Sequence, residues 1–154
     1  MKIEIKQLTD NQQKQHITRL ILEALPDWFG IPEAREEYIT ESADKIFFCA
    51  RIDDSPAGFL YLRETGKDTV ELYVMGVLKE YHRHGIGRKL FQAAKQSAAE
   101  KGYSFLQVKT VQMGKYEEYD RTNLFYLSLG FKEFEVFPTL WGEQNPCQIY
   151  LMSL

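Results

Sequence analysis

The residues in this sequence with the clearest chemical potential form a short basic segment that contains two glycines, HRHGIGR, at positions 82–88. It separates a stretch of strand character from a stretch of helical periodicity. At a helix N-terminus, unpaired backbone N–H groups and the positive end of the helix dipole attract phosphate oxygens, and neighbouring arginine or histidine side chains add charge. The segment therefore predicts an anion site whose natural ligand is a pyrophosphate.

Two common phosphate-binding loops do not match this segment. The Rossmann fingerprint requires a third glycine three residues after the second, and Leu90 occupies that position. A Walker loop requires Gly-Lys followed by Ser or Thr at its end, which the segment lacks. Two other interpretations stay open: Gly85 and Gly87 only permit a tight strand-to-helix turn, or the turn serves a nucleotide-binding domain.

Histidines and cysteines give no sign of a metal centre. His82 and His84 have only His16 as a further histidine in the chain, and no cluster of carboxylates accompanies them. Cys49 and Cys147 lie far apart in the sequence and outside any metal-ligand spacing. We therefore expect no metal, and two reduced thiols in a reducing compartment.

Length and composition set the class of the protein. The 154 residues, 44% of them hydrophobic, suffice for one continuous core, which predicts a single domain over residues 1–154. A formal net charge of −3 and a pI of about 5.7 give no drive toward nucleic acid and slightly favour a cationic substrate such as an amine. Residues 1–15 lack the apolar core of a signal peptide, and no run approaches a membrane span. We expect a cytoplasmic protein that binds neither nucleic acid nor membrane.

The elements that must position the glycine turn follow from hydrophobic periodicity. Alternating or dense apolar runs predict strands, and recurrence every three to four residues predicts helices. The predicted strands cover residues 1–8, 45–52, 57–63, 69–78, 103–111, 132–137 and 148–152. The predicted helices cover about residues 10–25, 32–42, 85–102 and 120–129.

This order of elements predicts an α+β fold with a mixed, mostly antiparallel central sheet of about seven strands flanked by four helices. The strand–helix–strand crossover that contains the glycine turn joins residues 69–78 to residues 103–111, and such a crossover favours a parallel pair. The short turns elsewhere favour antiparallel neighbours. The glycine turn is thus expected at the start of the crossover helix.

The segment ELYVMGVLKEYHRHGIGRKL at residues 71–90, with FYLSLGF at residues 125–131, resembles the GNAT superfamily of N-acetyltransferases. The family signature is Arg or Gln, two residues, Gly, any residue, and then Gly or Ala, at the start of the helix after the fourth strand. Here it reads HRHGIG, and His82 departs from the pattern. The order of elements resembles the family fold through the whole chain. The resemblance implies a GNAT-like fold and acetyl-CoA as cosubstrate.

By this resemblance, backbone amides of residues 83–88 bind the coenzyme A pyrophosphate, and a strand segment offers backbone groups to the pantetheine arm. The implied cofactor-binding residues are Met75, Gly76, Val77, His82, Arg83, His84, Gly85, Ile86, Gly87 and Arg88. Gly76 fits this picture because a glycine within a strand often marks a bulge or a close backbone approach. The alternative is that Gly76 is only a weak point in the strand.

The resemblance also implies two catalytic residues. Tyr126 occupies the place in FYLSLGF where many family members have the general acid for the coenzyme A sulfur, and a phenol with a pKa of about 10 can protonate a thiolate. Glu71 lies eleven residues before His82, similar to the base of some members, and strand alternation puts it on one face with Tyr73 and Met75. The alternatives are a core aromatic and an exposed strand glutamate.

Aromatic and acidic residues at positions 28–38 and 116–120 lie where the family fold covers the acceptor, and such groups suit a cation as well as a core. The implied function is transfer of an acetyl group from acetyl-CoA to a primary amine of a small molecule or peptide, by direct attack in a ternary complex. The alternative is a non-catalytic coenzyme A-binding sensor or interaction domain. The expected partners are the amine substrate and, in a homodimer, a second copy of the chain.

Overall fold

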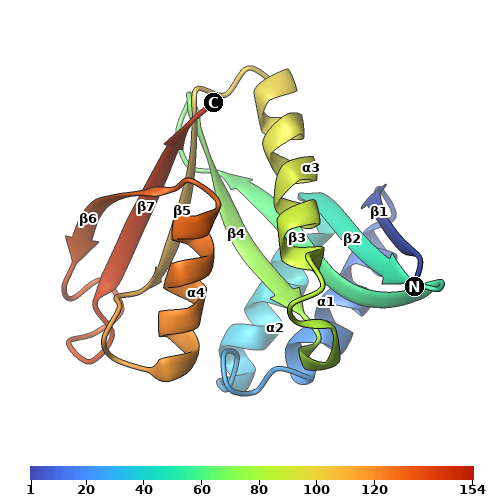
Figure 1. Ribbon diagram of the computed structural model, residues 1–154, viewed down its shortest axis with the longest axis horizontal. Helices are drawn as coiled ribbons and strands as arrows, with labels where there is room; N and C mark the ends of the chain where they lie inside the picture. The colour runs from blue at the N-terminus through green and yellow to red at the C-terminus, as the bar shows by residue number, and fades with distance from the viewer.

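A computed structural model describes all 154 residues, and it contains one central sheet with helices on both faces (Figure 1). The strands are β1 (Ile3–Leu8), β2 (Ile46–Ile52), β3 (Ser55–Glu64), β4 (Thr69–Val77), β5 (Phe105–Val111), β6 (Lys132–Phe137) and β7 (Cys147–Ser153). The helices are α1 (Asn11–Glu23), α2 (Pro32–Glu41), α3 (Ile86–Glu100) and α4 (Glu117–Ser128), with short 3-10 helices η1 (Ser42–Asp44) and η2 (Lys79–Tyr81).

The seven strands lie in the order β1-β2-β3-β4-β5-β7-β6. Only β4 and β5 run parallel; every other neighbouring pair is antiparallel. This confirms the predicted α+β fold class, with its mixed, mostly antiparallel sheet and four helices. It also confirms the parallel pair on either side of the crossover helix α3, because a crossover returns the chain to the same edge in the same direction.

Apolar side chains cover the two faces of the sheet in separate clusters. On the face of α3 and α4, one cluster contains Leu60, Leu90 and Phe131, all buried. On the face of α1 and α2, a second cluster contains Ile21 and a row of aromatic rings that includes Phe47. Figure 1 shows α3 and α4 in front of the sheet, and α1 and α2 behind it. Both faces of the sheet are therefore packed. The place for a cleft is between β4 and β5, which pair over only a few residues.

Local signals fix the ends of the helices. The side chain of Asp10 accepts a hydrogen bond of 2.8 Å from the amide of Gln13 at the start of α1, as a capping residue does. Pro32 is the first residue of α2, where its missing N–H is harmless. Helix α4 begins at Glu117, three residues before the predicted start at Asp120. Its acidic first turn complements the helix dipole, which explains the earlier start.

None of the four α-helices is long and apolar enough to cross a membrane.

Candidate active site

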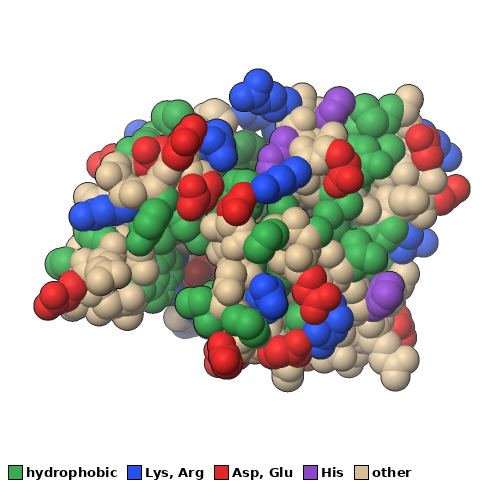
Figure 2. Space-filling view, turned by 90° about the horizontal axis from the view of Figure 1, so that it is seen from below, with side chains coloured by type: hydrophobic (Ala, Val, Ile, Leu, Met, Phe, Trp, Pro, Cys, Tyr) green, Lys and Arg blue, Asp and Glu red, His purple; other side chains and the backbone are tan.

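The strands β4 and β5 pair over only three residues each, Thr69 to Glu71 with Phe105 to Gln107. Beyond Glu71 they separate, and Figure 1 shows them meeting near the top and diverging toward the bottom. A cleft of about 1050 Å³ opens there, lined by both strands, the first turn of α3, one side of α4 and the loop between α1 and α2. Figure 2 looks at this lower face, where the surface is hollowed and hydrophobic side chains border the hollow. The cleft is thus a product of the splayed parallel pair.

The glycine turn opens directly into this cleft. Arg83 and Gly85 adopt left-handed backbone conformations, with φ of 68° and 77°. No side chain caps α3, its first turn contains no acidic residue, and the amides of Ile86, Gly87 and Arg88 have no hydrogen-bond acceptor in the protein. Unpartnered amides at a helix N-terminus fit a phosphate group. A left-handed arginine is uncommon, and such conformations concentrate at ligand-binding loops.

Two arginines supply positive charge to the turn. Arg83 and Arg88 are exposed, line the cleft and form no ion pair. Arg88 donates a hydrogen bond of 3.3 Å from Nη2 to the Ser128 hydroxyl at the end of α4. The two guanidinium groups therefore flank the mouth of the cleft, where they can meet anionic oxygens.

Gly87 permits a close approach between α3 and α4. An added Cβ would lie 2.9 Å from Cζ of Phe125 and 3.1 Å from Cε of Met75. The second glycine of the turn is therefore explained by packing across the cleft.

The two histidines of the turn differ in their positions. His82 lines the cleft, but its Nε2 lies 2.7 Å from the carbonyl oxygen of Val77, and its ring packs edge-on against Trp28. That contact joins the ring to the end of β4 and occupies one of its two ring nitrogens. His84 is exposed and does not line the cleft, because the left-handed Arg83 redirects the chain before it.

The strand β4 contains a bulge at Tyr73, which the strand-alternation argument missed. Tyr61 pairs with Val74 while Leu62 pairs with Leu72, so Tyr73 is the extra residue. The alternation of side chains changes phase there. Glu71 and Tyr73 both contact Arg63 on the α2 side, whereas Met75 reaches toward Gly87 on the α3 side. The prediction that Glu71, Tyr73 and Met75 share a face is therefore wrong.

The segment Met75, Gly76 and Val77 lines the cleft, and its edge toward β5 has no strand partner. The glycine at position 76 leaves no room for a side chain, since an added Cβ would lie 2.9 Å from Cγ2 of Ile21 and 3.1 Å from Cδ1 of Leu25. The free backbone edge remains available for hydrogen bonds to a bound molecule.

Glu71 lies at the apex of the splay and is only 3% exposed. Its Oε1 accepts a hydrogen bond of 2.9 Å from Nη2 of Arg63 on β3 and one of 3.3 Å from Nζ of Lys109 on β5. The ion pairs tie three strands together where the cleft begins. The other carboxylate oxygen, Oε2, receives no hydrogen bond from the protein, and the residue lines the cleft. The interpretation as an exposed strand glutamate is therefore wrong.

Tyr126 lies at the boundary between the core and the cleft. Its ring belongs to the core, where it packs edge-on against Phe131 and tilted against Tyr150, and it also lines the cleft. No protein group hydrogen-bonds to its hydroxyl. The hydroxyl oxygen is not fully buried, so a molecule in the cleft can reach it. Burial raises the pKa of Tyr126 well above its ordinary value, and the nearby Glu71 carboxylate adds to the effect. The phenol therefore stays protonated at neutral pH.

A buried asparagine holds the helix that carries Tyr126. Asn123 is fully buried; its Nδ2 donates to the carbonyl of Val111 at 2.8 Å, and its Oδ1 accepts from the Tyr150 hydroxyl at 2.5 Å. These bonds join α4 to β5 and β7. Asn123 does not line the cleft, so it orients α4 rather than contacting a ligand. A single asparagine in a helical pattern gave no signal of this role.

One end of the cleft is aromatic, and it meets the glycine turn where Trp28 packs edge-on against His82. We call Trp28, Phe29, Tyr38, Tyr73 and Tyr119 the aromatic end; all five line the cleft. Trp28 donates from Nε1 to the carbonyl of Glu118 at 3.4 Å, and the Tyr119 hydroxyl donates to the carbonyl of Trp28 at 2.9 Å. The loop after α1 is thereby fastened to the start of α4 across the cleft.

Charges in the cleft differ in sign from the chain as a whole. The cationic side chains that line it are Arg35, Arg83, Arg88, Lys109 and Arg121, and the carboxylates are Glu71 and Glu118. Asp120, another acidic residue predicted near the acceptor, does not line the cleft. Its carboxylate accepts a hydrogen bond of 2.7 Å from the amide of Gly114. The lining of the cleft is therefore more basic than the chain as a whole, whose net charge is −3. Arg35 and Lys109 escaped sequence reasoning because no motif contains them.

No group of three or more His, Cys, Asp and Glu side chains is placed to hold a metal ion. Both cysteines are buried, and burial raises the pKa of Cys49 and of Cys147 to about 11. Neither thiol is a reactive thiolate at neutral pH.

Comparison with known proteins places this architecture in a family. A sequence model of the family described as "Acetyltransferase (GNAT) domain" matches residues 43–133, which contain Glu71, the glycine turn and Tyr126. No curated protein matches the chain in a sequence search.

Solved structures share the fold across the whole chain. A GNAT-family protein from Desulfovibrio desulfuricans superposes with a TM-score of 0.83 at 20% identity, covering 99% of each chain. A GNAT family acetyltransferase from Elizabethkingia anophelis, solved with acetyl-CoA bound, gives 0.76 at 18% identity, covering 99% of this chain and 98% of its own. The PaiA N-acetyltransferase from Thermoplasma acidophilum, solved with coenzyme A, gives 0.74 at 20% identity, covering 100% of both.

Proposed function

The chain belongs to the GNAT acetyltransferase family, and from this premise we propose that it is an acetyl-CoA-dependent N-acetyltransferase acting as a single domain over residues 1–154. The acceptor is a primary amine of a small molecule or peptide, and the amine attacks directly in a ternary complex. The observation that carries the proposal is one continuous cleft that joins the unpartnered amides of α3 to the free hydroxyl of Tyr126.

The cosubstrate would lie along the glycine turn and the free edge of β4. The amides of Ile86, Gly87 and Arg88, with the Arg83 and Arg88 guanidinium groups, would hold its pyrophosphate, and the edge of β4 would hold its pantetheine arm. Acetyl-CoA supplies a thioester whose acyl carbon accepts the nitrogen of the amine. In His82, one ring nitrogen is occupied by the carbonyl oxygen of Val77, so at most the other can contact a phosphate.

In the balanced reaction, a bond forms between the amine nitrogen and the acyl carbon, the carbon–sulfur bond breaks, the nitrogen loses a proton and the sulfur gains one. Tyr126 donates its phenolic proton to the departing sulfur, and its raised pKa keeps that proton in place until the sulfur becomes basic. A backbone amide of Met75 or Val77 on the free edge of β4 stabilises the charge that develops on the carbonyl oxygen.

Glu71 is the proposed acceptor of the amine proton, directly or through a water. Its Oε1 is held by Arg63 and Lys109, so Oε2 is the oxygen that faces this task. The two cations hold the carboxylate in one orientation, as a positioned proton acceptor requires. Proton transfer by such a group contributes on the order of 100-fold to a rate.

A thiol-release assay with acetyl-CoA across polyamines, aminoglycosides, amino acids and short peptides tests the function. We expect amine-dependent release of coenzyme A and an acetamide product detectable by mass spectrometry. Calorimetry of acetyl-CoA binding runs beside it. Absence of binding at millimolar acetyl-CoA would overturn the proposal.

A second candidate is a coenzyme A-binding sensor domain without turnover, and the ion pairs that occupy Glu71 favour it. The Glu71→Gln variant separates the two functions. In an enzyme it lowers the turnover rate and leaves acetyl-CoA binding nearly intact. Saturable binding with no amine-dependent release in the wild-type protein would support the sensor.

A further inference from the structure

The cations of the cleft divide into those that have a partner and those that do not. Lys109 pairs with Glu71 at 3.3 Å, and Arg121 pairs with Glu117 at 3.3 Å. Arg35, Arg83 and Arg88 line the cleft without any carboxylate within ion-pair distance. A guanidinium that faces a cleft without a partner is suited to an anionic ligand, because its planar donors match carboxylate and phosphate oxygens.

Two of these three arginines are accounted for by the phosphates of the cosubstrate at the glycine turn. Arg35 is different, because it comes from α2 and is anchored beside Phe29 rather than within the glycine turn. Its Nη1 donates a hydrogen bond of 3.0 Å to the carbonyl of Phe29. That is the only hydrogen bond of its side chain, so one donor anchors the guanidinium and the others stay free.

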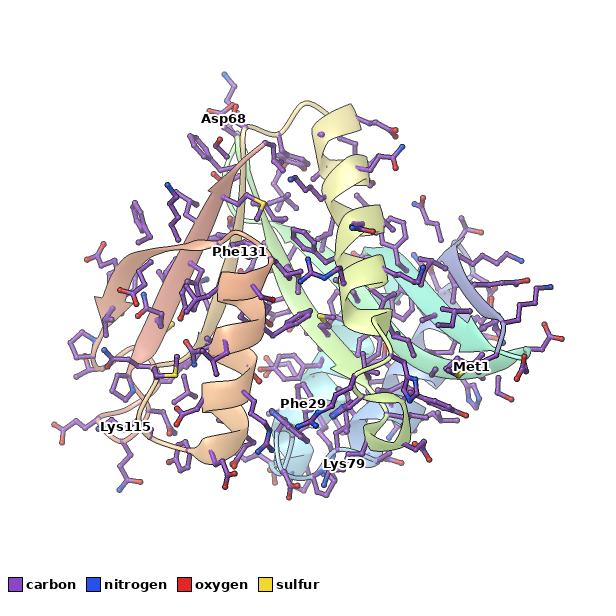
Figure 3. All side chains as sticks on the ribbon, viewed as in Figure 1. Met1, Phe29, Asp68, Lys79, Lys115 and Phe131 are labelled. Carbon is purple, nitrogen blue, oxygen red and sulfur yellow. The ribbon has the colours of Figure 1, made fainter.

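Aromatic rings lie beside the anchor of Arg35 at Phe29, and the nearest carboxylate that acts on its charge, Glu36, is paired with Arg19. Phe29 packs edge-on against Tyr38, and Tyr38 packs edge-on against Tyr73. Figure 3 shows Phe29 at the lower end of the molecule, between the lower ends of α4 and α3. The pocket around the free guanidinium therefore offers rings for an apolar side chain beside a cation for an anion.

The charges at this end disfavour an acceptor that carries several positive charges. Of the two carboxylates that line the cleft, Glu71 is neutralised by Arg63 and Lys109, which leaves only Glu118. A polyamine or aminoglycoside would have to place its additional ammonium groups near Arg35 or Lys109, and like charges repel strongly in a partly buried site.

We propose that the acceptor is an amino acid with an apolar or aromatic side chain, and that Arg35 binds its carboxylate while its amine is acetylated. This inference rests on the proposed acetyltransferase function and names its substrate class. The carboxylate meets the free donors of Arg35, the side chain packs on Phe29 and Tyr38, and the amine points toward Glu71 and Tyr126 deeper in the cleft.

The test compares substrates that differ only in the carboxylate. Phenylalanine is paired with phenethylamine, and leucine with isoamylamine, in the thiol-release assay. We expect kcat/KM for each amino acid to exceed that of its matched amine by about tenfold or more, as a charge-assisted hydrogen bond predicts. Equal or better use of the matched amines would overturn the inference and leave the acetyltransferase function standing.

Variants of Arg35 then assign the preference to that side chain. In Arg35→Gln, the ratio of kcat/KM between amino acid and matched amine falls to about one, and Arg35→Lys retains part of it because the charge remains without the planar fork. Because both substrates are measured on the same protein, a general loss of folding or activity leaves the ratio unchanged. Arg121→Gln is the control, since Arg121 also lines the cleft but is paired with Glu117. An unchanged ratio in Arg35→Gln would overturn the role of Arg35.

A binding measurement keeps the inference separate from turnover. Calorimetry of phenylalanine and phenethylamine against protein saturated with coenzyme A should show tighter binding of phenylalanine, lost in Arg35→Gln. If phenylalanine binds with this preference and no thiol is released, the proposed function fails and the carboxylate site stands. If neither compound binds and other amines are acetylated, the carboxylate site fails and the proposed function stands.

Discussion

The glycine-turn end and the aromatic end of the cleft are built from the chain in opposite ways. The glycine-turn end uses backbone amides and side chains from seven consecutive residues, 82–88. The aromatic end gathers Trp28 and Tyr38 from the segments after α1, Tyr73 from the bulge of β4, and Tyr119 from α4. A group shared by all members of a family can be bound by backbone, whereas selection among acceptors requires side chains that can vary.

The two ends also differ in how they are stabilised. The turn depends on left-handed conformations at Arg83 and Gly85, which are properties of a few residues. The aromatic end depends on contacts between distant segments. An example is the pair of hydrogen bonds between Trp28 and the start of α4, which are separated by about ninety residues in the sequence. The two ends touch where Trp28 packs against His82. Changes to the first turn of α3 should therefore act mainly on cosubstrate binding, and changes at Tyr38 or Tyr119 mainly on the amine.

The largest effect is expected at the junction of the two ends. Tyr126→Phe removes the only hydroxyl proposed to protonate the departing sulfur, so kcat should fall about 100-fold while the Kd of acetyl-CoA stays unchanged. Steady-state kinetics and calorimetry measure the two quantities. Tyr81→Phe is the matched control, since Tyr81 also lines the cleft without a hydrogen bond from its hydroxyl. A decrease in kcat of less than threefold in Tyr126→Phe would remove Tyr126 from the mechanism.

A change confined to the glycine turn should follow. In Gly87→Val, the new side chain would collide with Phe125 and Met75 and displace the first turn of α3. Overpacking of this kind costs about 1–3 kcal/mol of stability, and a loss of about 1.4 kcal/mol from cosubstrate binding would raise the Kd of acetyl-CoA about tenfold. Gly66→Val is the control because nothing lies within 4 Å of its added Cβ. If the KM of the amine rose while the Kd of acetyl-CoA did not, the separation of the two ends would be wrong.

A smaller effect is expected at the aromatic end. Tyr119→Phe removes the 2.9 Å hydrogen bond to the carbonyl of Trp28 that fastens the loop across the cleft. One such bond contributes about 1 kcal/mol, so the KM of the amine should rise about fivefold while acetyl-CoA binding stays constant. Tyr116→Phe, whose hydroxyl bonds to Asn145 instead, should leave both constants unchanged. A weaker acetyl-CoA affinity in Tyr119→Phe would contradict this assignment.

The smallest expected effect is on the alkaline side of the pH profile. Because burial raises the pKa of Tyr126, its phenol stays protonated up to and beyond its ordinary pKa of about 10. The value of kcat at saturating substrates should therefore not decline between about pH 8 and pH 10 from loss of this proton. A decline in the wild-type enzyme that is missing in Tyr126→Phe would show that the phenol titrates in this range.

Local patterns predicted most of the fold because they depend on short stretches of chain. The alternation in β1, the cap at Asp10 and Pro32 at the start of α2 are each contained in a few residues. The parallel pair of β4 and β5 followed from the length of the crossover through α3. The bulge at Tyr73 was missed, because it arises from a shift in pairing with β3 that β4 alone does not encode.

In the candidate site, too, local motifs were predicted and contacts between distant residues were not. The resemblance located Glu71, the glycine turn and Tyr126, and all of these residues except His84 line the cleft. It did not predict that one ring nitrogen of His82 contacts the carbonyl oxygen of Val77. It gave no indication of the cations on Glu71, because Arg63 and Lys109 come from neighbouring strands on either side of it.

By itself, the sequence determined the family, the order of the elements and an anion site at the start of α3, since motif, periodicity and helix termini act over short distances. Only the tertiary structure decided the charge of the cleft, the phase of β4 beyond its bulge and the free guanidinium of Arg35 among aromatic rings. All three features depend on contacts between residues that are distant in the sequence. Pairing across a folded sheet is set by the packing of both its faces, and no single segment contains that information.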